Sequence, residues 1–177
     1  MNQSSQPYQY QNSLHRKTRN ALVTTTLALI SEKGLSACNM IEIADQARVS
    51  RASLYNHFRD KNDVFLAVID FEIERISTLA SRGNGLSEKL YIFSKEISAN
   101  QALSKSLALD PALLTKAISA REHQLWAKIY QTLTFHISSD VAGVALVLRW
   151  LVGQIFLPLS LEHSKEQAAR LARELSR

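Results

Sequence analysis

Apolar residues recur at helical spacing along most of the chain, and the alternation typical of strands is absent. Leu22, Leu29 and Ile30 form the first stripe, and Gly34 ends it in the manner of a C-terminal cap. Glycine and proline are scarce, so the sequence predicts an all-α protein. The predicted helices cover residues 14–33, 39–47, 50–58, 61–81, 87–100, 101–108, 111–137, 140–159 and 165–177.

Two of these helices are short and are separated by a tight turn. Asn39 has the character of an N-cap, with Glu42 three residues later, and Ser50 can cap the next helix. Val49 and Leu54 are predicted to be buried and to fix the angle between the two helices. This is the helix-turn-helix arrangement, whose second helix enters the major groove of DNA. A helical hairpin with a solvated face would show the same pattern.

Basic residues are concentrated in the first third of the chain. Residues 1–62 hold eight Lys and Arg against four Asp and Glu, a net +4, and the remainder holds 13 against 12, a net +1. Arg16 and Lys17 begin the first helix, where cations oppose the helix dipole, which favours a phosphate partner over a structural role. A charge balance of this size also occurs on ordinary solvated surfaces.

The helix-turn-helix contains a specific run of residues: Asn39-Met40-Ile41-Glu42-Ile43-Ala44, Val49-Ser50, Ser53-Leu54-Tyr55-Asn56-His57-Phe58 and Lys61. This run closely resembles the N-terminal domain of the tetracycline-repressor (TetR) family, and the resemblance covers about residues 14–70. It implies a dimeric transcriptional regulator that binds double-stranded DNA at a palindromic operator. The DNA-binding domain would cover residues 14–60, and a helical effector-binding and dimerisation domain would cover residues 61–177.

Carried over residue by residue, the resemblance puts Arg51 and Ala52 at base-reading positions, with Asn56 as a third. Arginine can bind guanine O6 and N7 through two hydrogen bonds, although phosphate contact and a solvated surface remain open for Arg51. The other predicted DNA-binding residues support the helix, cap it or contact the DNA backbone: Asn39, Ser50, Ser53, Tyr55, His57, Lys61, Arg16 and Lys17.

Three positions depart from the family pattern. Ile41 stands where a polar or basic residue is common, so base reading from the first helix of the pair is expected to be lost. Arg48 occupies the usual glycine of the turn, where a positive φ costs a non-glycine residue about 1 kcal/mol. Ala52 replaces a frequent glycine or proline, which is harmless in a helix.

The sequence carries no motif of a hydrolase, a zinc protease or a phosphate-binding loop, and its five histidines are scattered. Cys38 is the only cysteine, which excludes an internal disulfide and fits a reducing cytoplasm. The polar residues 1–13 lack the apolar segment of a signal peptide and are predicted to be a disordered tail. We therefore predict a cytoplasmic protein that is not an enzyme and uses no cofactor or metal.

Apolar residues in the second half supply either a filled core or a ligand pocket between helices. By resemblance the ligand would be a small apolar or amphipathic effector that releases a repressor from its operator. The candidate ligand-binding residues are Phe93, Ile97, Glu122, His123, Trp126 and Tyr130.

Residues 141–161 are almost wholly apolar and long enough to span a bilayer. Arg149, Gln154 and Pro158 interrupt them, which favours a helix buried against a partner over a membrane-associated protein. A helical protein that does not bind DNA is a further alternative. Two copies of the last two helices are predicted to pack as a four-helix bundle about a two-fold axis. The predicted interface residues are Val144, Leu148, Leu151, Val152, Ile155 and Leu159.

Overall fold

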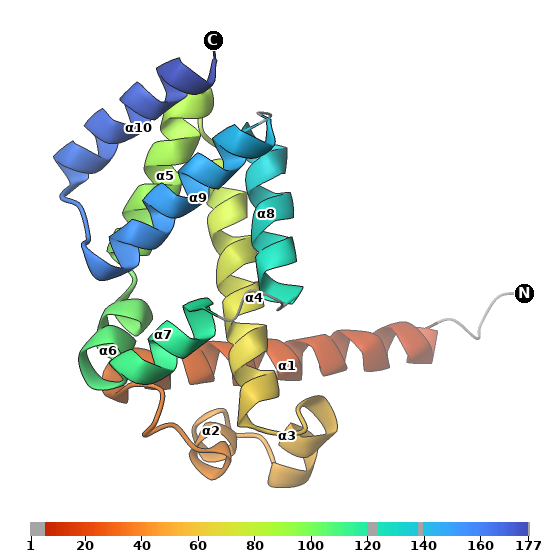
Figure 1. Ribbon diagram of the computed structural model, residues 1–177. Helices are drawn as coiled ribbons and strands as arrows, with labels where there is room; N and C mark the ends of the chain where they lie inside the picture. The colour runs from red at the N-terminus through yellow and green to blue at the C-terminus, as the bar shows by residue number, and fades with distance from the viewer. Residues whose placement is uncertain (1–5, 120–123, 138–139, 177) are drawn as a thin grey trace, which may run out of the picture.

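The computed structural model describes residues 6–119, 124–137 and 140–176, which form ten α-helices with no strand among them. The all-α prediction is therefore confirmed. In Figure 1, α4 is the long axis of the molecule, with α2 and α3 at one end and α9 and α10 toward the other. The helices are α1 (Gln6–Lys33), α2 (Met40–Gln46), α3 (Arg51–His57), α4 (Lys61–Ala80), α5 (Leu86–Ser98), α6 (Gln101–Leu109), α7 (Pro111–Ser119), α8 (Gln124–Ile137), α9 (Val141–Phe156) and α10 (Leu161–Leu175).

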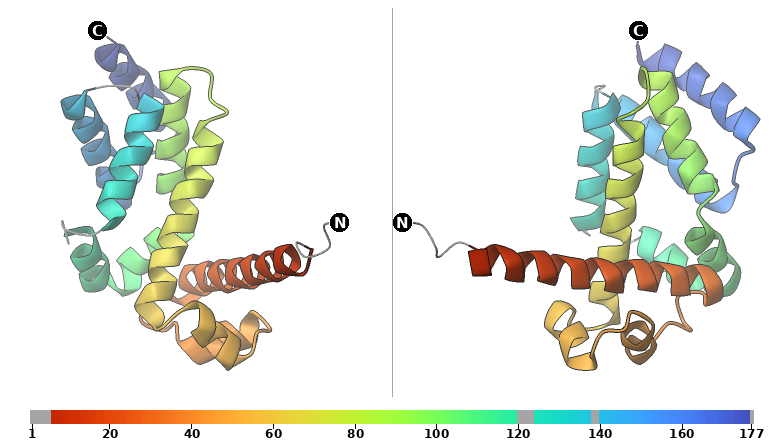
Figure 2. Two further views of the ribbon diagram at one scale, coloured as in Figure 1. Left: turned by 90° about the vertical axis from the view of Figure 1, so that its right-hand side faces the viewer. Right: turned by 180° about the vertical axis from the view of Figure 1, so that it is seen from behind.

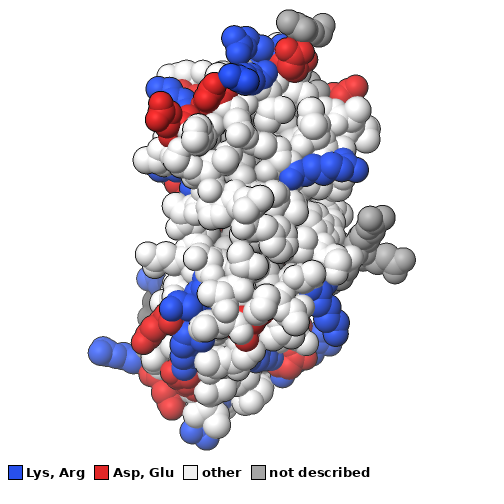
Figure 3. Space-filling model, turned by 60° about the vertical axis from the view of Figure 1, so that its left-hand side comes forward, with Lys and Arg blue, Asp and Glu red and all other residues white. Residues whose placement is uncertain are grey.

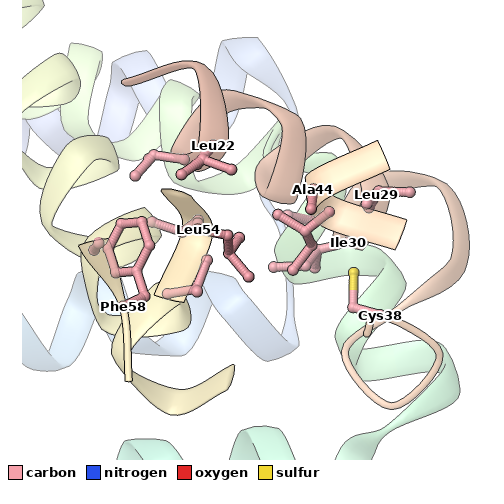
Figure 4. Close-up of a cluster of buried hydrophobic side chains, with 13 residues drawn as sticks. Leu22, Leu29, Ile30, Cys38, Ala44, Leu54 and Phe58 are labelled. Carbon is pink, nitrogen blue, oxygen red and sulfur yellow. The ribbon is translucent and has the colours of Figure 1, made fainter. Parts of the chain in front are cut away.

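The head of the molecule, which comprises α1, α2, α3 and the first turns of α4, is built around one apolar cluster. Leu22 and Ile30 belong to it from α1, and Leu54 belongs to it from α3 (Figure 4). Leu54 has no exposed surface, as predicted, whereas Val49, predicted to be buried, is half-buried and packs against the cluster. Burial stabilises each such side chain by about 1.5–3 kcal/mol. The cluster therefore fixes one side of α3 against α1 and leaves the other side facing outward.

Helix α4 belongs to both halves of the molecule. Val64 and Val68 lie in the cluster of the head, whereas Ile76 and Ala80 lie in a second cluster with residues of α5, α8, α9 and α10. We call the rest of α4 together with α5–α10 the body. Figure 2 shows α1 running crosswise to α4. The core of the head thus continues to Val68, past the predicted boundary at residue 60.

Helix α1 and the pair α7 and α8 differ from the sequence prediction. Helix α1 begins at Gln6, so residues 6–13, predicted as a tail, form its first turns, and Pro7 stands in the first turn, where proline is tolerated. The single helix predicted over residues 111–137 is wrong, because α7 and α8 run in different directions (Figure 1). Helix α7 packs on α6, whereas α8 packs on α4 and α9. Residues 111–137 therefore contain two helices because the two parts pack on different partners.

The apolar residues 141–161 form α9 and reach the start of α10. Helix α10 begins earlier than the predicted residue 165, because the Ser160 side chain accepts a hydrogen bond from the His163 N–H and caps it. By length and composition, none of the described helices would cross a membrane alone. Helices α8 and α9 together are long and apolar enough to cross one, but the angle between them is 112°.

Candidate nucleic-acid interface

Side-chain caps set the start of both helices in the helix-turn-helix. The Asn39 Oδ1 accepts a hydrogen bond from the Glu42 N–H at 2.9 Å, and the Ser50 Oγ accepts one from the Ser53 N–H at 3.1 Å. Both Asn39 and Ser50 have extended backbone, as N-cap residues do. The caps confirm the predicted helix starts at these two residues.

The turn between α2 and α3 contains a left-handed residue. Arg48 has φ 55°, and it is the one non-glycine residue with positive φ among the described residues. The Val49 N–H donates to the Ala44 carbonyl at 3.0 Å, which closes the turn tightly. The positive φ predicted for the usual glycine position is confirmed, and it costs arginine about 1 kcal/mol.

The outward side of α3 presents polar and small side chains. Arg51, Ala52, Tyr55 and Asn56 are exposed, whereas Ser53 is half-buried. Tyr55 keeps 54% of its surface exposed although it is a large aromatic residue. Within the described part of the chain, the side chains of Arg51 and Asn56 make no hydrogen bond or ion pair. These side chains can therefore form hydrogen bonds with the edges of bases in a DNA groove.

His57 connects α3 to the basic segment of α1 around Arg16 and Lys17, which lies inside the helix and not at its start as predicted. Its ring lies 4.0 Å from the ring of His15, centroid to centroid, and the Arg19 guanidinium lies 5.3 Å from the Phe58 ring centroid. Burial lowers the pKa of His57, and the nearby His15 and Arg19 lower it further. Its Nδ1 is buried and has no hydrogen-bond partner among the residues that the structure describes. His15 is not among the predicted DNA-binding residues, because its contact with His57 depends on how α1 crosses α3.

The other predicted phosphate-binding residues differ in whether their side chains already make contacts within the protein. Arg16 and Lys17 are exposed on α1. Lys61 is partly engaged, because its Nζ donates to the Ser36 carbonyl at 3.1 Å and lies 5.2 Å from the Phe65 ring centroid. Arg16 and Lys17 are therefore free to reach a phosphate, whereas Lys61 already stabilises the loop between α1 and α2.

The predicted ligand-binding residues differ in how deeply they are buried. Phe93 is buried in the core of the body with its ring against His136, and Tyr130 is 38% exposed. Ile97 and Trp126 are half-buried, and Glu122 and His123 lie outside the described residues. Two surface hollows, one between α5 and α10 and one between α9 and α10, are lined by other residues. Among the described residues, no three His, Cys, Asp or Glu side chains are grouped for a metal.

The predicted interface residues of α9, and Leu159 in the segment that follows it, do not all face outward. Val144 and Leu151 are buried in the core of their own protomer, which removes them from the predicted interface. Leu148, Val152, Ile155 and Leu159 are half-buried. The large apolar residues exposed on α9 are Val141, Leu146 and Phe156. In Figure 3, a broad band between the head and the opposite end shows few charged side chains.

Sequence comparison matches the helix-turn-helix region. Residues 22–68 match the profile described as bacterial regulatory proteins, tetR family. The HTH-type transcriptional regulator AcrR of Shigella flexneri is 34% identical over 64 residues, which cover 36% of this chain and 30% of AcrR. The HTH-type transcriptional repressor BepR of Brucella suis biovar 1 is 35% identical over 69 residues, which cover 37% of this chain and 33% of BepR. The chain thus matches about a third of the length of these curated relatives.

Structure comparison extends over most of the chain. The TetR family repressor AlkX from Dietzia sp. has a TM-score of 0.64 at 18% identity, covering 89% of this chain and 95% of AlkX. A putative TetR-family transcriptional regulator from Rhodococcus sp. has a TM-score of 0.62 at 17% identity, covering 90% of this chain and 98% of that regulator. At such low identity the similarity shows the fold, which both halves of this chain share with these proteins.

Proposed function

The chain belongs to the TetR family through residues 22–68, and from this premise we propose that it is a transcriptional regulator that binds a palindromic DNA operator as a homodimer. The observation that carries the proposal is the outward side of α3, where Arg51 and Asn56 are exposed and, among the described residues, have no side-chain partner. The net charge of +4 on residues 1–62 suits a polyanionic partner.

Roles for individual residues follow from their chemistry and exposure. Arg51 stands at the start of α3 and can bind guanine O6 and N7 through two hydrogen bonds. Asn56, one turn further along the exposed side, can donate to and accept from adenine. The hydroxyls of Ser50 and Tyr55 can donate to phosphate oxygens, which fixes the register without reading sequence. Arg16 and Lys17 would add phosphate contacts from α1 and make binding depend on salt.

We propose that the exposed side of α9 is the dimer interface. It exposes Val141, Leu146 and Phe156, an apolar set of a kind that marks a protein contact when it is contiguous. Gly153 lies exposed inside the same helix, and an added Cβ would meet nothing within 4 Å. Glycine inside a helix is less stable than alanine by about 0.5–1 kcal/mol. This protomer offers no packing reason for Gly153, whereas the close passage of a helix from a second copy does.

We further propose that a small apolar or amphipathic effector controls DNA binding through the body, with residues 14–60 as the DNA-binding domain and residues 61–177 as the regulatory one. The apolar composition of the body supports this class of ligand. Repression is proposed over activation because BepR carries the name of a repressor. An effector acts only if it binds the arrangement that cannot bind DNA more tightly than the one that can.

Selection from a random-sequence DNA duplex library tests DNA binding directly. The purified protein is mixed with the library and excess competitor DNA, and bound duplexes are recovered and sequenced over successive rounds. The expected result is enrichment of one inverted repeat, bound by two protomers. Recovery without sequence enrichment at low salt, or no recovery at all, would contradict the proposed function.

A further inference from the structure

A carboxylate of the body holds the loop that leads into the helix-turn-helix. Asp110 lies between α6 and α7, and its Oδ2 accepts a hydrogen bond from the Ser36 N–H at 3.1 Å. The Ser36 hydroxyl donates to the other carboxylate oxygen, Oδ1. The two residues are 74 positions apart in sequence. These bonds from Ser36 lower the pKa of Asp110, which keeps it ionised as an acceptor.

The backbone of the same loop is shaped for this approach. Gly34 has φ 84°, and a Cβ added there would lie 2.8 Å from the Asp110 Oδ2 and 3.2 Å from the Leu109 Cδ1. A side chain at position 34 would therefore strain the backbone and collide with the junction between α6 and α7. Helix α6 also packs along α1, and its Ala102 lies in the apolar cluster of the head. The junction is thus fixed against the head by packing as well as by hydrogen bonds.

Ser36 is held from a second direction by Lys61. The Lys61 Nζ donates to the Ser36 carbonyl at 3.1 Å from the first residue of α4. The N–H of Ser36 is therefore bound by the carboxylate of Asp110, and its carbonyl is bound by the ammonium group of Lys61. Ser36 stands three residues before Asn39, the N-cap of α2. Fixing Ser36 fixes the point from which α2 and α3 begin.

We propose that Asp110 is a positioning residue for DNA recognition, and that together with Lys61 it holds Ser36 so that α3 is presented at the correct angle. The inference rests on the proposed DNA-binding function and assigns Asp110 no contact with DNA. Lys61 acts in it through Ser36, which revises the phosphate contact that the family resemblance implies. Hydrogen bonds to an ionised group are stronger than those between neutral groups. The contact between Asp110 and Ser36 can therefore bias the orientation of α2 and α3.

The test compares Asp110→Ala with Asp110→Asn on the operator selected above. Alanine removes both acceptors, so operator affinity should fall about tenfold, while the dimer measured by sedimentation is unchanged. Asparagine can accept from the Ser36 N–H and donate to its hydroxyl, so it should restore most of the affinity. The slope of log affinity against log salt should stay at the wild-type value in both variants, because no phosphate contact is lost.

Further variants keep the proposal falsifiable if Asp110→Ala fails to fold. Ser36→Ala removes only the hydroxyl at an exposed position and should lower affinity by a smaller factor. Adding Lys61→Met to Ser36→Ala should cost less than the product of the single effects, with the salt slope unchanged. Wild-type affinity in Asp110→Ala and Ser36→Ala would overturn the role of Asp110. If the affinity losses of Ser36→Ala and Lys61→Met multiply in the double variant, and log affinity depends less steeply on log salt, the proposed role of Lys61 is wrong. Absence of any operator for the wild type would instead remove the proposed function itself.

Discussion

Two helices of this molecule each bury one side and leave the other uncovered, and their uncovered sides differ in chemistry. Helix α3 exposes Arg51, Tyr55 and Asn56, groups that can donate or accept hydrogen bonds. Helix α9 exposes mainly apolar residues, among them Val141 and Leu146, which can do neither, although the charged Arg149 is exposed beside them. A polar surface without internal partners suits a ligand with directional groups, such as the edges of bases. An apolar one suits burial against another copy of the chain. The contrast supports the proposed placing of DNA contacts in the head and of the contact with a second copy in the body.

The strongest way to break this comparison is to place a charge on each side of α9. Leu151 is 4% exposed, so Leu151→Asp buries an unpaired carboxylate and should unfold the body, at a cost of about 4 kcal/mol or more. Leu146 is 49% exposed, so Leu146→Asp should leave the protomer folded and abolish the dimer. Thermal unfolding and sedimentation velocity measure the two effects.

Leu113 provides the matched control for Leu146. It is also 49% exposed but lies on α7. Leu113→Asp should stay dimeric and as stable as the wild type to within about 0.5 kcal/mol. If Leu146→Asp stays dimeric as well, the interface lies elsewhere than on α9.

A smaller effect compares histidines in the head and the body. Burial lowers the pKa of His136, and Lys89 lowers it further, while its Nε2 lies 2.8 Å from the Ser77 hydroxyl. As pH falls below about 6.5, the unfolded chain takes up a proton that folded His136 resists, so the free energy of unfolding falls. Thermal unfolding between about pH 7.5 and about pH 5.5 should therefore depend less on pH in His136→Gln. The control is His163→Gln, at an exposed position of α10.

The same change of pH should act in the opposite direction on DNA binding. The pKa of His57 is lowered in the free protein, and a nearby phosphate would raise it, so binding would take up a proton. Operator affinity should therefore increase as pH falls over the range in which the protein stays folded. An affinity that decreases in step with stability would show that His57 faces no phosphate.

The parts of the fold that the sequence predicts depend on neighbouring residues. The caps at Asn39 and Ser50 can be predicted from the sequence because donor and acceptor are three residues apart. The positive φ of Arg48 can be predicted because members of the family carry glycine at this position of the turn. Of the residues of α3 that the resemblance places at DNA-binding positions, Ser53 and His57 are half-buried and the others are exposed.

The parts that the sequence does not predict depend on how distant elements meet. The contacts of Asp110 with Ser36 and of His15 with His57 leave no local pattern. Helix α9 is apolar on nearly every side, so spacing alone cannot tell buried Leu151 from exposed Leu146.

The most direct test of the central claim is the base preference of Arg51→Ala on the selected operator. Affinities are measured for every single-base variant of one half-site, with wild type and variant in parallel. The matched control is Arg59→Ala, because Arg59 is also exposed but lies outside α3 and pairs with Asp63. We expect a loss of about 1–3 kcal/mol and relaxed preference at one G·C pair per half-site for Arg51→Ala alone. Unchanged affinity and unchanged preference in Arg51→Ala would contradict the claim that the outward side of α3 reads DNA.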